Sequence, residues 1–286
     1  MTDSMKEKVC IVTGANSGIG KITALELAKL GATVVMLCRD KDRGEEAQSE
    51  IKTESENESI DLMLADLSSQ QSIRQFASDY QKKYDKLHVL INNAGVNPSK
   101  RYETVDGIEK TFAINTLAPF LLSNLLLKTL KNSIPARIIN VASGMQSKSI
   151  NFDNLQSKKY FRSWKAYSRS KTALILITYE FARRLNGSGI TVNCLHPGFT
   201  KTNITRDYKG IIKFFTKIIF RFAKSPEEGA ETSIYLASSP EVEGVSGKYF
   251  INKKEAKSKD ITYDTSVAKK LWDVCANLTK LNGKNT

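Results

Sequence analysis

Short apolar runs alternate with helix-like stretches along most of this chain. Each apolar run is only a few residues long and ends at a turn. Parallel strands joined by helical crossovers produce this pattern, because helices then cover both faces of the sheet and the strands are buried. The sequence therefore predicts an α/β fold built on a doubly wound parallel sheet of the Rossmann type. The expected strands are Val9–Thr13, Thr33–Cys38, Asp61–Leu64, Leu87–Asn92, Arg137–Ala142 and Thr191–Leu195, and the expected helices span about 18–30, 41–54, 70–84, 107–130 and 164–185.

A single domain over residues 1–286 accounts for the whole sequence. The chain has 41% hydrophobic and 26% charged residues, the balance of an ordinary globule with a full core. No internal repeat or Pro/Gly/Ser-rich linker divides it. The segment Gly198–Lys224 lacks a strand pattern, so we expect a helical lid inserted there, after the sixth strand. We also expect a C-terminal extension over about 252–286.

The composition favours an ordinary soluble protein, and we expect it in the cytoplasm or at the periphery of a membrane. Its four cysteines are far apart and lack the spacing of metal ligands, so we expect buried free thiols in a reducing compartment and no metal site. The chain starts with a short polar segment and has no run of about 18 apolar residues, so we expect neither a signal peptide nor a membrane-spanning helix. The formal charge is +13, but no nucleic-acid-binding motif occurs and we expect no nucleic-acid partner.

A glycine-rich loop joins the first expected strand to the first expected helix. In Thr13–Gly20, Gly14 permits a tight turn, Gly18 lets the backbone approach a pyrophosphate, and Gly20 lets the helix pack closely on the sheet. The N-terminus of the helix then offers free N–H groups to an anion. Because the loop follows a strand and opens a helix, we predict that it binds the phosphates of a dinucleotide.

The end of the second strand indicates which dinucleotide is bound. An acidic residue there hydrogen-bonds the ribose 2′-hydroxyl of NAD(H), whereas an arginine accommodates the 2′-phosphate of NADP(H). Cys38 stands where the acid is expected and Arg39 follows it, while Lys21 adds positive charge nearby. Asp40 is an acid at a plausible position, but it could equally cap the helix that begins near Lys41. The sequence favours NADP(H) over NAD(H).

Tyr167 and Lys171 form a candidate acid–base pair. Their spacing of four residues on an expected helix places both side chains on one face. A nearby ammonium group favours the phenolate and lowers the tyrosine pKa from its usual value of about 10. The pair is therefore suited to proton transfer at neutral pH.

Polar residues follow two other expected strands at the same edge of the sheet. Ser143 follows Arg137–Ala142, and Asn92-Asn93-Ala94-Gly95 ends the fourth strand. Ligands bind at this edge in open α/β sheets. Asn115 lies among apolar residues of the next helix, where a buried amide needs partners; a functional role and a satisfied core asparagine both remain open.

Taken together, these motifs resemble the short-chain dehydrogenase/reductase family. The matching positions, in order along about residues 7–250, are Thr13–Gly20, Asp66, Asn92–Gly95, Asn115, Ser143, Tyr167, Lys171 and Pro197-Gly198. A narrower resemblance is to the retinol-dehydrogenase-like branch of the family. It rests on Cys38-Arg39-Asp40, Ile150–Gln156, Trp164–Tyr167, Phe181–Leu185, His196-Pro197-Gly198 and Leu271–Val274.

The resemblance implies a catalytic role for four residues. Tyr167 would pass a proton to or from the substrate oxygen, and Lys171 would bind the nicotinamide ribose and lower the Tyr167 pKa. Ser143 would hydrogen-bond the substrate carbonyl, and Asn115 would support a proton relay. Many family members carry paired serines where this chain has Ala142-Ser143, so Ser143 is the candidate.

The resemblance also implies the cofactor contacts. Asp66 would contact the adenine, Asn93 the ribose region and Thr202 the nicotinamide end. The full implied set is Gly14, Asn16, Ser17, Gly18, Ile19, Gly20, Arg39, Asp66, Leu67, Asn93, Ala94, Gly95, Tyr167, Lys171, Pro197, Gly198 and Thr202.

A basic amphipathic stretch follows soon after Thr202. Lys209, Lys213, Lys217 and Arg221 recur every four residues in segment 209–224, and most of the other residues are aliphatic or aromatic. One interpretation is a lid helix packed on the core with its basic side chains in solvent. The other is a helix that also makes peripheral contact with an anionic membrane and admits a lipophilic substrate.

The sequence thus predicts an NADP(H)-dependent oxidoreductase that interconverts a carbonyl and an alcohol on a lipophilic substrate, such as an aldehyde, a ketone or a retinoid. Two alternatives remain open: a catalytically silent NADP(H)-binding scaffold or regulator, and a double-bond reductase of the same fold. The four catalytic positions hold competent residue types, which favours the enzyme. Family members often pair through the helices that bear Asn115 and Tyr167, so we expect a homodimer.

Overall fold

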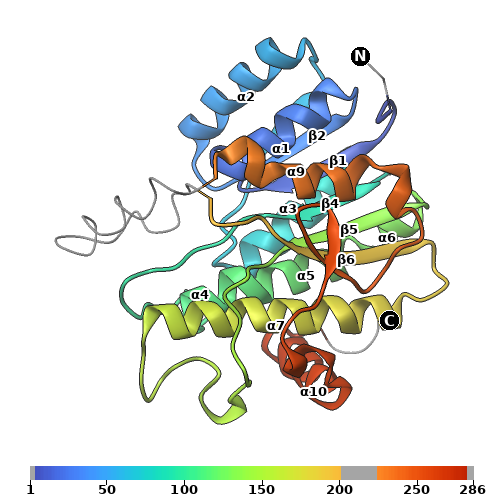
Figure 1. Ribbon diagram of the computed structural model, residues 1–286. Helices are drawn as coiled ribbons and strands as arrows, with labels where there is room; N and C mark the ends of the chain where they lie inside the picture. Colours follow the sequence, from blue (N-terminus) through green and yellow to red (C-terminus); the bar gives the residue numbers. More distant parts are fainter. Residues whose placement is uncertain (1–3, 201–223, 282–286) are drawn as a thin grey trace.

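The computed structural model describes residues 4–200 and 224–281, and in them eight strands form one sheet (Figure 1). The strand order is β3-β2-β1-β4-β5-β6-β7-β8; the first seven strands are parallel, and β8 is antiparallel to β7. This arrangement confirms the predicted doubly wound sheet. The strands are β1 Val9–Thr13, β2 Thr33–Cys38, β3 Ile60–Leu64, β4 Val89–Asn92, β5 Ala136–Val141, β6 Ile190–His196, β7 Tyr249–Ile251 and β8 Lys254–Ala256.

Helices cover both faces of the sheet, as Figure 1 shows. One face carries α1 (Gly18–Lys29), α2 (Lys41–Ser55) and α9 (Pro226–Ser238). The other carries α3 (Gln70–Lys83), α5 (Ala118–Leu125), α6 (Leu127–Lys131) and α7 (Ser163–Arg184), with α10 (Thr265–Leu278) packed outside them. Short helical turns complete the chain: α4 Lys110–Phe112, η1 Ala113–Leu117, η2 Phe152–Asn154, η5 Pro240–Val242 and η6 Asp260–Tyr263.

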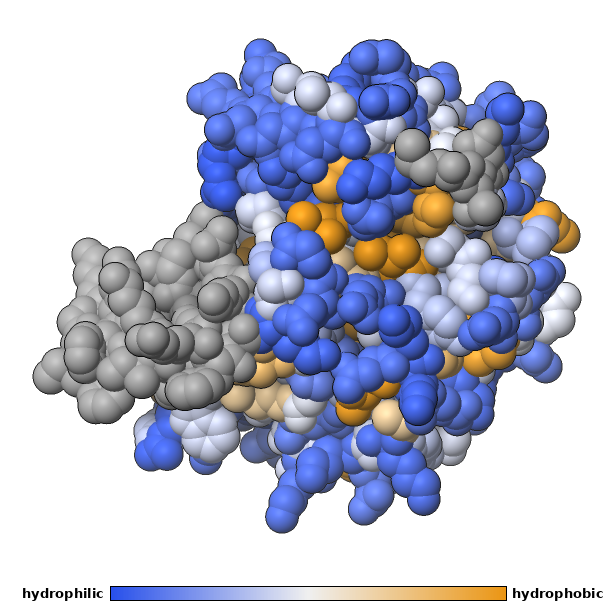
Figure 2. Space-filling view, turned by 45° about the horizontal axis from the view of Figure 1, so that its top comes forward, coloured by the Kyte–Doolittle hydropathy of each residue, from blue (hydrophilic) through white to orange (hydrophobic). Residues whose placement is uncertain are grey.

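The pleat of each central strand divides its side chains between two apolar layers. In β1, Cys10 and Val12 pack in the layer under α1 and α2, whereas Ile11 packs in the layer under α3 and α5. Successive side chains of a strand point to opposite faces, so a strand covered on both sides is apolar throughout. The face of the molecule in Figure 2 is mostly hydrophilic, and apolar residues reach this surface in patches.

The helix predicted over 107–130 is interrupted. It begins at Lys110 and passes through η1, a π-helical turn, before continuing as α5 and then α6. Pro119 explains the π turn: it has no N–H to donate to the carbonyl of Asn115, and its ring clashes with that carbonyl in a regular α-helix. Asn115 therefore lies within a widened turn.

The C-terminal part of the chain adds elements that the sequence pattern does not predict. Strands β7 and β8 have three residues each, too short for a periodic signal. Helix α10 packs on the outer face of α5 and α7, where the ring of Trp272 meets Phe120 at 4.8 Å and Phe181 at 4.7 Å between centroids. This aromatic cluster fixes the end of the chain to the core.

The predicted lid, 198–224, lies outside the described residues except at its two ends. There the N–H of Lys224 donates to the carbonyl of Phe199 at 2.7 Å, so the two ends lie side by side after β6. Within the described ranges, no helix has the length and apolar character needed to cross a bilayer.

Candidate active site

A cleft of about 680 Å³ opens at the carboxyl edge of the parallel sheet. Loops that follow β1, β2, β3, β4, β5 and β6 line it, because all these strands end at the same edge. The cleft brings together nearly all the predicted site residues: Gly14, Asn16, Ser17, Gly18, Ile19, Gly20, Arg39, Asp66, Leu67, Asn93, Ala94, Gly95, Ser143, Tyr167, Lys171, Pro197 and Gly198. Of the other two, Asn115 is buried behind the wall and Thr202 lies outside the described residues.

The glycine loop has the shape of a phosphate cradle. A Cβ on Gly20 would lie 2.4 Å from both the Asn93 amide nitrogen and the Gly14 carbonyl oxygen, so only glycine fits there. Gly18 has a φ of +55° and open space where a Cβ would point. Ser17 precedes α1 but makes no side-chain hydrogen bond to its first turn. The first N–H groups of α1 are therefore not capped by the Ser17 side chain, and they can donate to an anion bound in the cleft.

Thr13 ties the glycine loop to the loop after β4. Its hydroxyl accepts hydrogen bonds from the N–H groups of Asn93 and Ala94, each at 2.9 Å. The side-chain amide of Asn93 donates in return to the Thr13 carbonyl at 2.8 Å. Asn93 thus lines the cleft while its amide is used to hold two loops together, which makes it a positioning residue for the cradle.

Arg39 and Arg43 line the far end of the cleft, beyond β2. Neither guanidinium forms a salt bridge with any residue that the structure describes. Asp40 accepts a hydrogen bond from the Arg43 N–H at 3.1 Å and so caps α2. Lys21, expected to add free positive charge here, is instead ion-paired with Glu50. At this end of the cleft, two arginines that the structure describes are thus free of ion pairs.

Asp66 shapes the turn after β3. Its Oδ1 accepts hydrogen bonds from the N–H and the hydroxyl of Ser68, at 2.9 and 2.7 Å. The Asp66 N–H donates to the hydroxyl of Ser72 in α3 at 3.0 Å. These bonds hold Asp66 and Leu67 against the cleft.

Tyr167 and Ser143 face each other across the other end of the cleft. Burial raises the pKa of Tyr167, and a hydrogen bond with the Ser143 hydroxyl opposes that shift. The net effect is a Tyr167 pKa above its usual value. The Ser143 hydroxyl also accepts a hydrogen bond from the Met145 N–H at 3.0 Å, which orients it.

Lys171 joins the middle of α7 to the end of β5. Its Nζ donates to the Val141 carbonyl at 2.7 Å and lies 5.9 Å from the centroid of the Tyr167 ring. The side chain is only 3% exposed, and burial lowers its pKa to about 8. Burial therefore makes the Lys171 amine easier to deprotonate, and with a pKa of about 8 it still carries its proton in most molecules at neutral pH.

Asn115 is held by three hydrogen bonds behind the wall of the cleft. Its Oδ1 accepts from the Val96 N–H at 2.8 Å, and its Nδ2 donates to the Val96 carbonyl and the Ser170 hydroxyl, both at 3.0 Å. Ser170 donates in turn to the Tyr167 carbonyl at 2.7 Å. The side chain of Asn115 therefore links the loop after β4 to the turn of α7 that bears Tyr167. The carbonyl of Asn115 lacks an α-helical donor because residue 119 is proline.

His196 belongs to the His196-Pro197-Gly198 motif, but the sequence did not predict that it lines the cleft. It ends β6 and lines the cleft, and its buried Nδ1 has no hydrogen-bond partner among the described residues. Burial lowers its pKa, and a Cβ on Gly144 would lie 2.9 Å from its Nε2. A histidine at the end of a strand at this edge was a usable signal. The other lining residues that were not predicted as site residues are Leu37, Asp40, Arg43, Ala65, Val96, Asn97, Pro98, Lys110, Ile114, Val141, Ala142, Gly144, Met145, Phe199 and Thr200.

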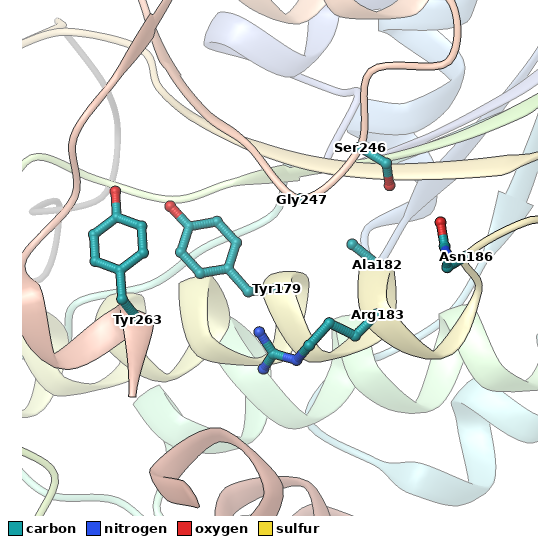
Figure 3. Close-up of a pocket in the computed structure, with 7 residues that line it drawn as sticks. All are labelled: Tyr179, Ala182, Arg183, Asn186, Ser246, Gly247 and Tyr263. Atoms are coloured by element: carbon teal, nitrogen blue, oxygen red, sulfur yellow. The ribbon is translucent and has the colours of Figure 1, made fainter. Parts of the chain in front are cut away.

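A second cavity, of about 400 Å³, lies along the C-terminal half of α7 (Figure 3). Tyr179 and Tyr263 stack at one end with centroids 5.5 Å apart, and Asn186 and Ser246 lie at the other. The Tyr179 hydroxyl forms a hydrogen bond with the Ser258 hydroxyl. No lysine is among the described residues that line the cavity. It therefore lacks the pairing of a tyrosine with a lysine that the main cleft has.

The comparisons with known proteins agree with this geometry. Residues 8–210 match the family described as short chain dehydrogenase. The chain is 45% identical over 287 residues to retinol dehydrogenase 14 of Homo sapiens, which covers 94% of this chain and 85% of that protein. It is 43% identical over 275 residues to retinol dehydrogenase 11 of Mus musculus, covering 96% of this chain and 87% of that protein.

Two solved structures are similar throughout. A crystal structure from Mycobacterium paratuberculosis is 30% identical, with a TM-score of 0.77, and covers 98% of this chain and 97% of that chain. The Pseudomonas aeruginosa RhlG/NADP active-site complex is 27% identical, with a TM-score of 0.70, and covers 87% of this chain and 95% of that chain.

Proposed function

Because the chain belongs to the short-chain dehydrogenase/reductase family and resembles its retinol dehydrogenases, we propose that it is an NADP(H)-dependent enzyme for lipophilic carbonyl and alcohol substrates. As a member of this family it is an oxidoreductase that interconverts carbonyls and alcohols. The proposal adds the cofactor preference, the substrate class and the residues that move the proton. One observation carries it: a single cleft holds a phosphate cradle at one end and Ser143, Tyr167 and Lys171 at the other.

Tyr167 is the proton donor in the direction of carbonyl reduction. Its phenol lies beside the Ser143 hydroxyl, so both groups can hydrogen-bond one substrate oxygen. A raised pKa keeps the phenol protonated at neutral pH, which suits a group that must donate. In alcohol oxidation the same oxygen of Tyr167 takes the proton back. The bound cofactor supplies or accepts the hydride.

Lys171 holds the proton-transfer end of the cleft in place. One N–H group of its ammonium donates a hydrogen bond to the Val141 carbonyl, and the other N–H groups can donate to a ribose hydroxyl. With a pKa of about 8 the amine can also exchange a proton close to neutral pH, which would resupply Tyr167. The tie from Asn115 through Ser170 to the Tyr167 carbonyl keeps this turn of α7 aligned.

NADP(H) is the preferred cofactor because two arginines line the end of the cleft where the adenosine ribose would bind. The aspartate there is used as a helix cap. Arg39 and Arg43 lack ion-pair partners among the described residues, and the carboxylate of Asp40 is used to cap α2. A 2′-phosphate fits two guanidinium groups, which bind phosphates with paired N–H donors. The similar RhlG structure is named as an NADP complex, which supports the same cofactor class.

A lipophilic substrate suits the open side of the cleft. Met145 and Phe199 line it and are each 51% exposed, so apolar side chains surround the approach to Tyr167. Two similar proteins are named retinol dehydrogenases, and a retinoid or another long apolar aldehyde or ketone has the matching chemistry. The predicted homodimer stays a proposal, and α10 already covers the outer face of α5 and α7 that such a pairing would use.

The experiment that tests this function is a substrate screen with NADPH and NADH run side by side. We expect oxidation of NADPH with lipophilic aldehydes or ketones, and a lower kcat/KM with NADH. Cofactor binding without turnover of any carbonyl would support the scaffold alternative instead. Turnover of activated double bonds but not of carbonyls would support the double-bond reductase.

A further inference from the structure

A short stretch beside the mouth of the cleft combines exposed aromatic rings with positive charge only. This basic aromatic loop, Lys158–Lys165, contains four basic residues, three aromatic residues and no acidic residue. Tyr160 is 57% exposed and Trp164 is 55% exposed. Large rings in a folded protein are normally buried, so two that face solvent within one loop indicate an interaction surface.

The positive charge of the loop is not balanced nearby in the sequence. No acidic residue occurs between Asp153 and Glu180. Among the described residues, none of the four basic side chains of the loop forms a salt bridge. Glu103, which feels the charge of Lys158, is already paired with Arg101 at 2.7 Å. The charge is therefore available to an external anionic partner.

The cations and rings of the loop form one mixed surface. The guanidinium of Arg162 lies 5.1 Å from the centroid of the Tyr160 ring, and its Nε donates to the Tyr160 hydroxyl at 2.7 Å. The ammonium of Lys165 lies 5.5 Å from the Trp164 ring. Aromatic rings with a polar edge beside basic side chains suit the boundary between lipid headgroups and acyl chains.

Hydrogen bonds at both ends hold the loop against the body of the protein. Arg169 of α7 donates to the hydroxyl of Ser157 and to the carbonyl of Asn154, the latter at 3.1 Å. Ser163 donates to the carbonyl of Pro98 at 2.8 Å. The exposed rings are thus presented from a fixed position.

The loop lies next to the route into the active site. Pro98, which receives the bond from Ser163, lines the cleft, and Trp164 precedes Tyr167 by three residues on α7. The half-exposed Met145 and Phe199 continue the cleft with apolar side chains. A surface that touches the loop therefore faces the path by which an apolar substrate would reach Tyr167.

We propose that the basic aromatic loop docks the protein on an anionic lipid bilayer, with the mouth of the cleft turned toward the membrane. Four cations gain from the negative surface potential, and Tyr160 and Trp164 enter the headgroup region. Beside the loop, the mouth of the cleft presents the apolar side chains of Met145 and Phe199, which favour a bilayer over RNA as the partner. The docking itself follows from the loop residues. Only the delivery of a lipophilic substrate rests on the proposed function.

The first test is co-sedimentation with vesicles of phosphatidylcholine, with and without phosphatidylserine. We expect binding only with phosphatidylserine, and loss of binding at high salt. Replacing Lys158, Lys159, Arg162 and Lys165 together with Gln should weaken binding about 100-fold or more, because each cation contributes roughly fivefold at an anionic surface. Unchanged binding of this variant would overturn the proposal.

A charge-matched control variant replaces exposed lysines near the opposite edge of the sheet. Lys6, Lys86, Lys128 and Lys131 lie close to the amino ends of β1, β4 and β5. Their replacement with Gln changes the net charge equally and should leave vesicle binding almost unaltered. Equal loss in both variants would mean that net charge alone drives binding, and would contradict docking through the loop.

Tryptophan fluorescence gives an independent readout. The chain has two tryptophans: Trp272 belongs to α10 and is 5% exposed, whereas Trp164 is in the loop. Lipids brominated on the acyl chain should quench the wild type on vesicle binding but not Trp164→Phe, in which only Trp272 emits. No quenching of the wild type, or stronger binding to single-stranded RNA than to the vesicles, would overturn the proposal.

Activity measurements separate this proposal from the proposed function. If the loop docks the enzyme, the fourfold Gln variant should turn over a water-soluble aldehyde normally and lose turnover of a vesicle-embedded one. Equal turnover of both substrates by that variant would contradict delivery through the loop. If the proposed function is wrong, neither substrate is reduced, while binding to phosphatidylserine vesicles persists.

Discussion

The Nζ of Lys171 donates a 2.7 Å hydrogen bond to the main-chain carbonyl of Val141, the last residue of β5. This bond fixes α7 to the carboxyl edge of the sheet within one turn of Tyr167. It also holds an amine in a site so buried that its pKa falls to about 8. The same buried position of Lys171 therefore fixes α7 on the sheet and lowers the pKa of the amine.

The burial of Lys171 makes stability depend on pH in a defined window. Its pKa is lowered in the folded protein, so between about pH 8 and pH 10 the unfolded chain binds the extra proton. Relative to Lys171→Met, the free energy of unfolding of the wild type should rise with pH in that window, by up to about 1.4 kcal/mol per pH unit. Urea unfolding of both proteins at several pH values measures this. A difference that is independent of pH would show that the amine is not perturbed.

Arg39 should set the choice of cofactor. Arg39→Gln removes one guanidinium from the ribose end of the cleft, so kcat/KM with NADPH should fall about 10- to 100-fold, with little change for NADH. Lys41→Gln is the matched control, because Lys41 is a neighbouring cation that does not line the cleft. An equal loss with both cofactors would place Arg39 outside 2′-phosphate recognition.

Gly20 should tolerate no side chain. A Cβ there would lie 2.4 Å from the Gly14 carbonyl, so Gly20→Ala should cost about 1–3 kcal/mol of stability and displace the phosphate cradle. Gly107→Ala, at a loop glycine with a φ of +71° and open space, should cost about 1 kcal/mol and leave NADPH affinity intact. Calorimetry and NADPH titration measure the two effects. Tight NADPH binding by Gly20→Ala would contradict the close packing.

Asn115 should act through position. Asn115→Ala removes the partners of the N–H and carbonyl of Val96 in a partly buried site, at a cost of about 1–3 kcal/mol. The loss of its bond to Ser170 should lower kcat more than it raises KM, because Tyr167 loses alignment. Denaturant unfolding and steady-state kinetics test both parts. A variant of normal stability and normal kcat would remove Asn115 from the site.

The sheet and most of the cleft were predictable because each depends on local sequence signals. Buried parallel strands are continuous apolar runs, and ligands gather where such strands end, so Ser143 and the glycine loop could be placed together. The three-residue β7 carries no periodic pattern. The π turn could have been predicted only by recognising that Pro119 has no N–H to donate to the carbonyl of Asn115, four residues earlier.

Other features of the site depend on tertiary contacts. Met145 and Phe199 lie on loops without a motif, and His196 belongs to a motif that implied no site role for it. The fold brings all three residues to the cleft. The expected effect of Lys171 on the Tyr167 pKa was a pairwise argument from helical spacing. Burial acts on both groups in the folded protein, lowering the lysine pKa and raising the tyrosine pKa, and that balance is not encoded in spacing.

The central claim is that the Tyr167 hydroxyl transfers the proton. Tyr179→Phe is the control, since Tyr179 lies on the same helix and its hydroxyl bonds Ser258 outside the cleft. The decisive measurement is kcat/KM of Tyr167→Phe with NADPH and a carbonyl substrate, together with NADPH affinity. We predict a loss of about 10²- to 10⁴-fold in kcat/KM with unchanged NADPH affinity; turnover close to that of the wild type would contradict the account.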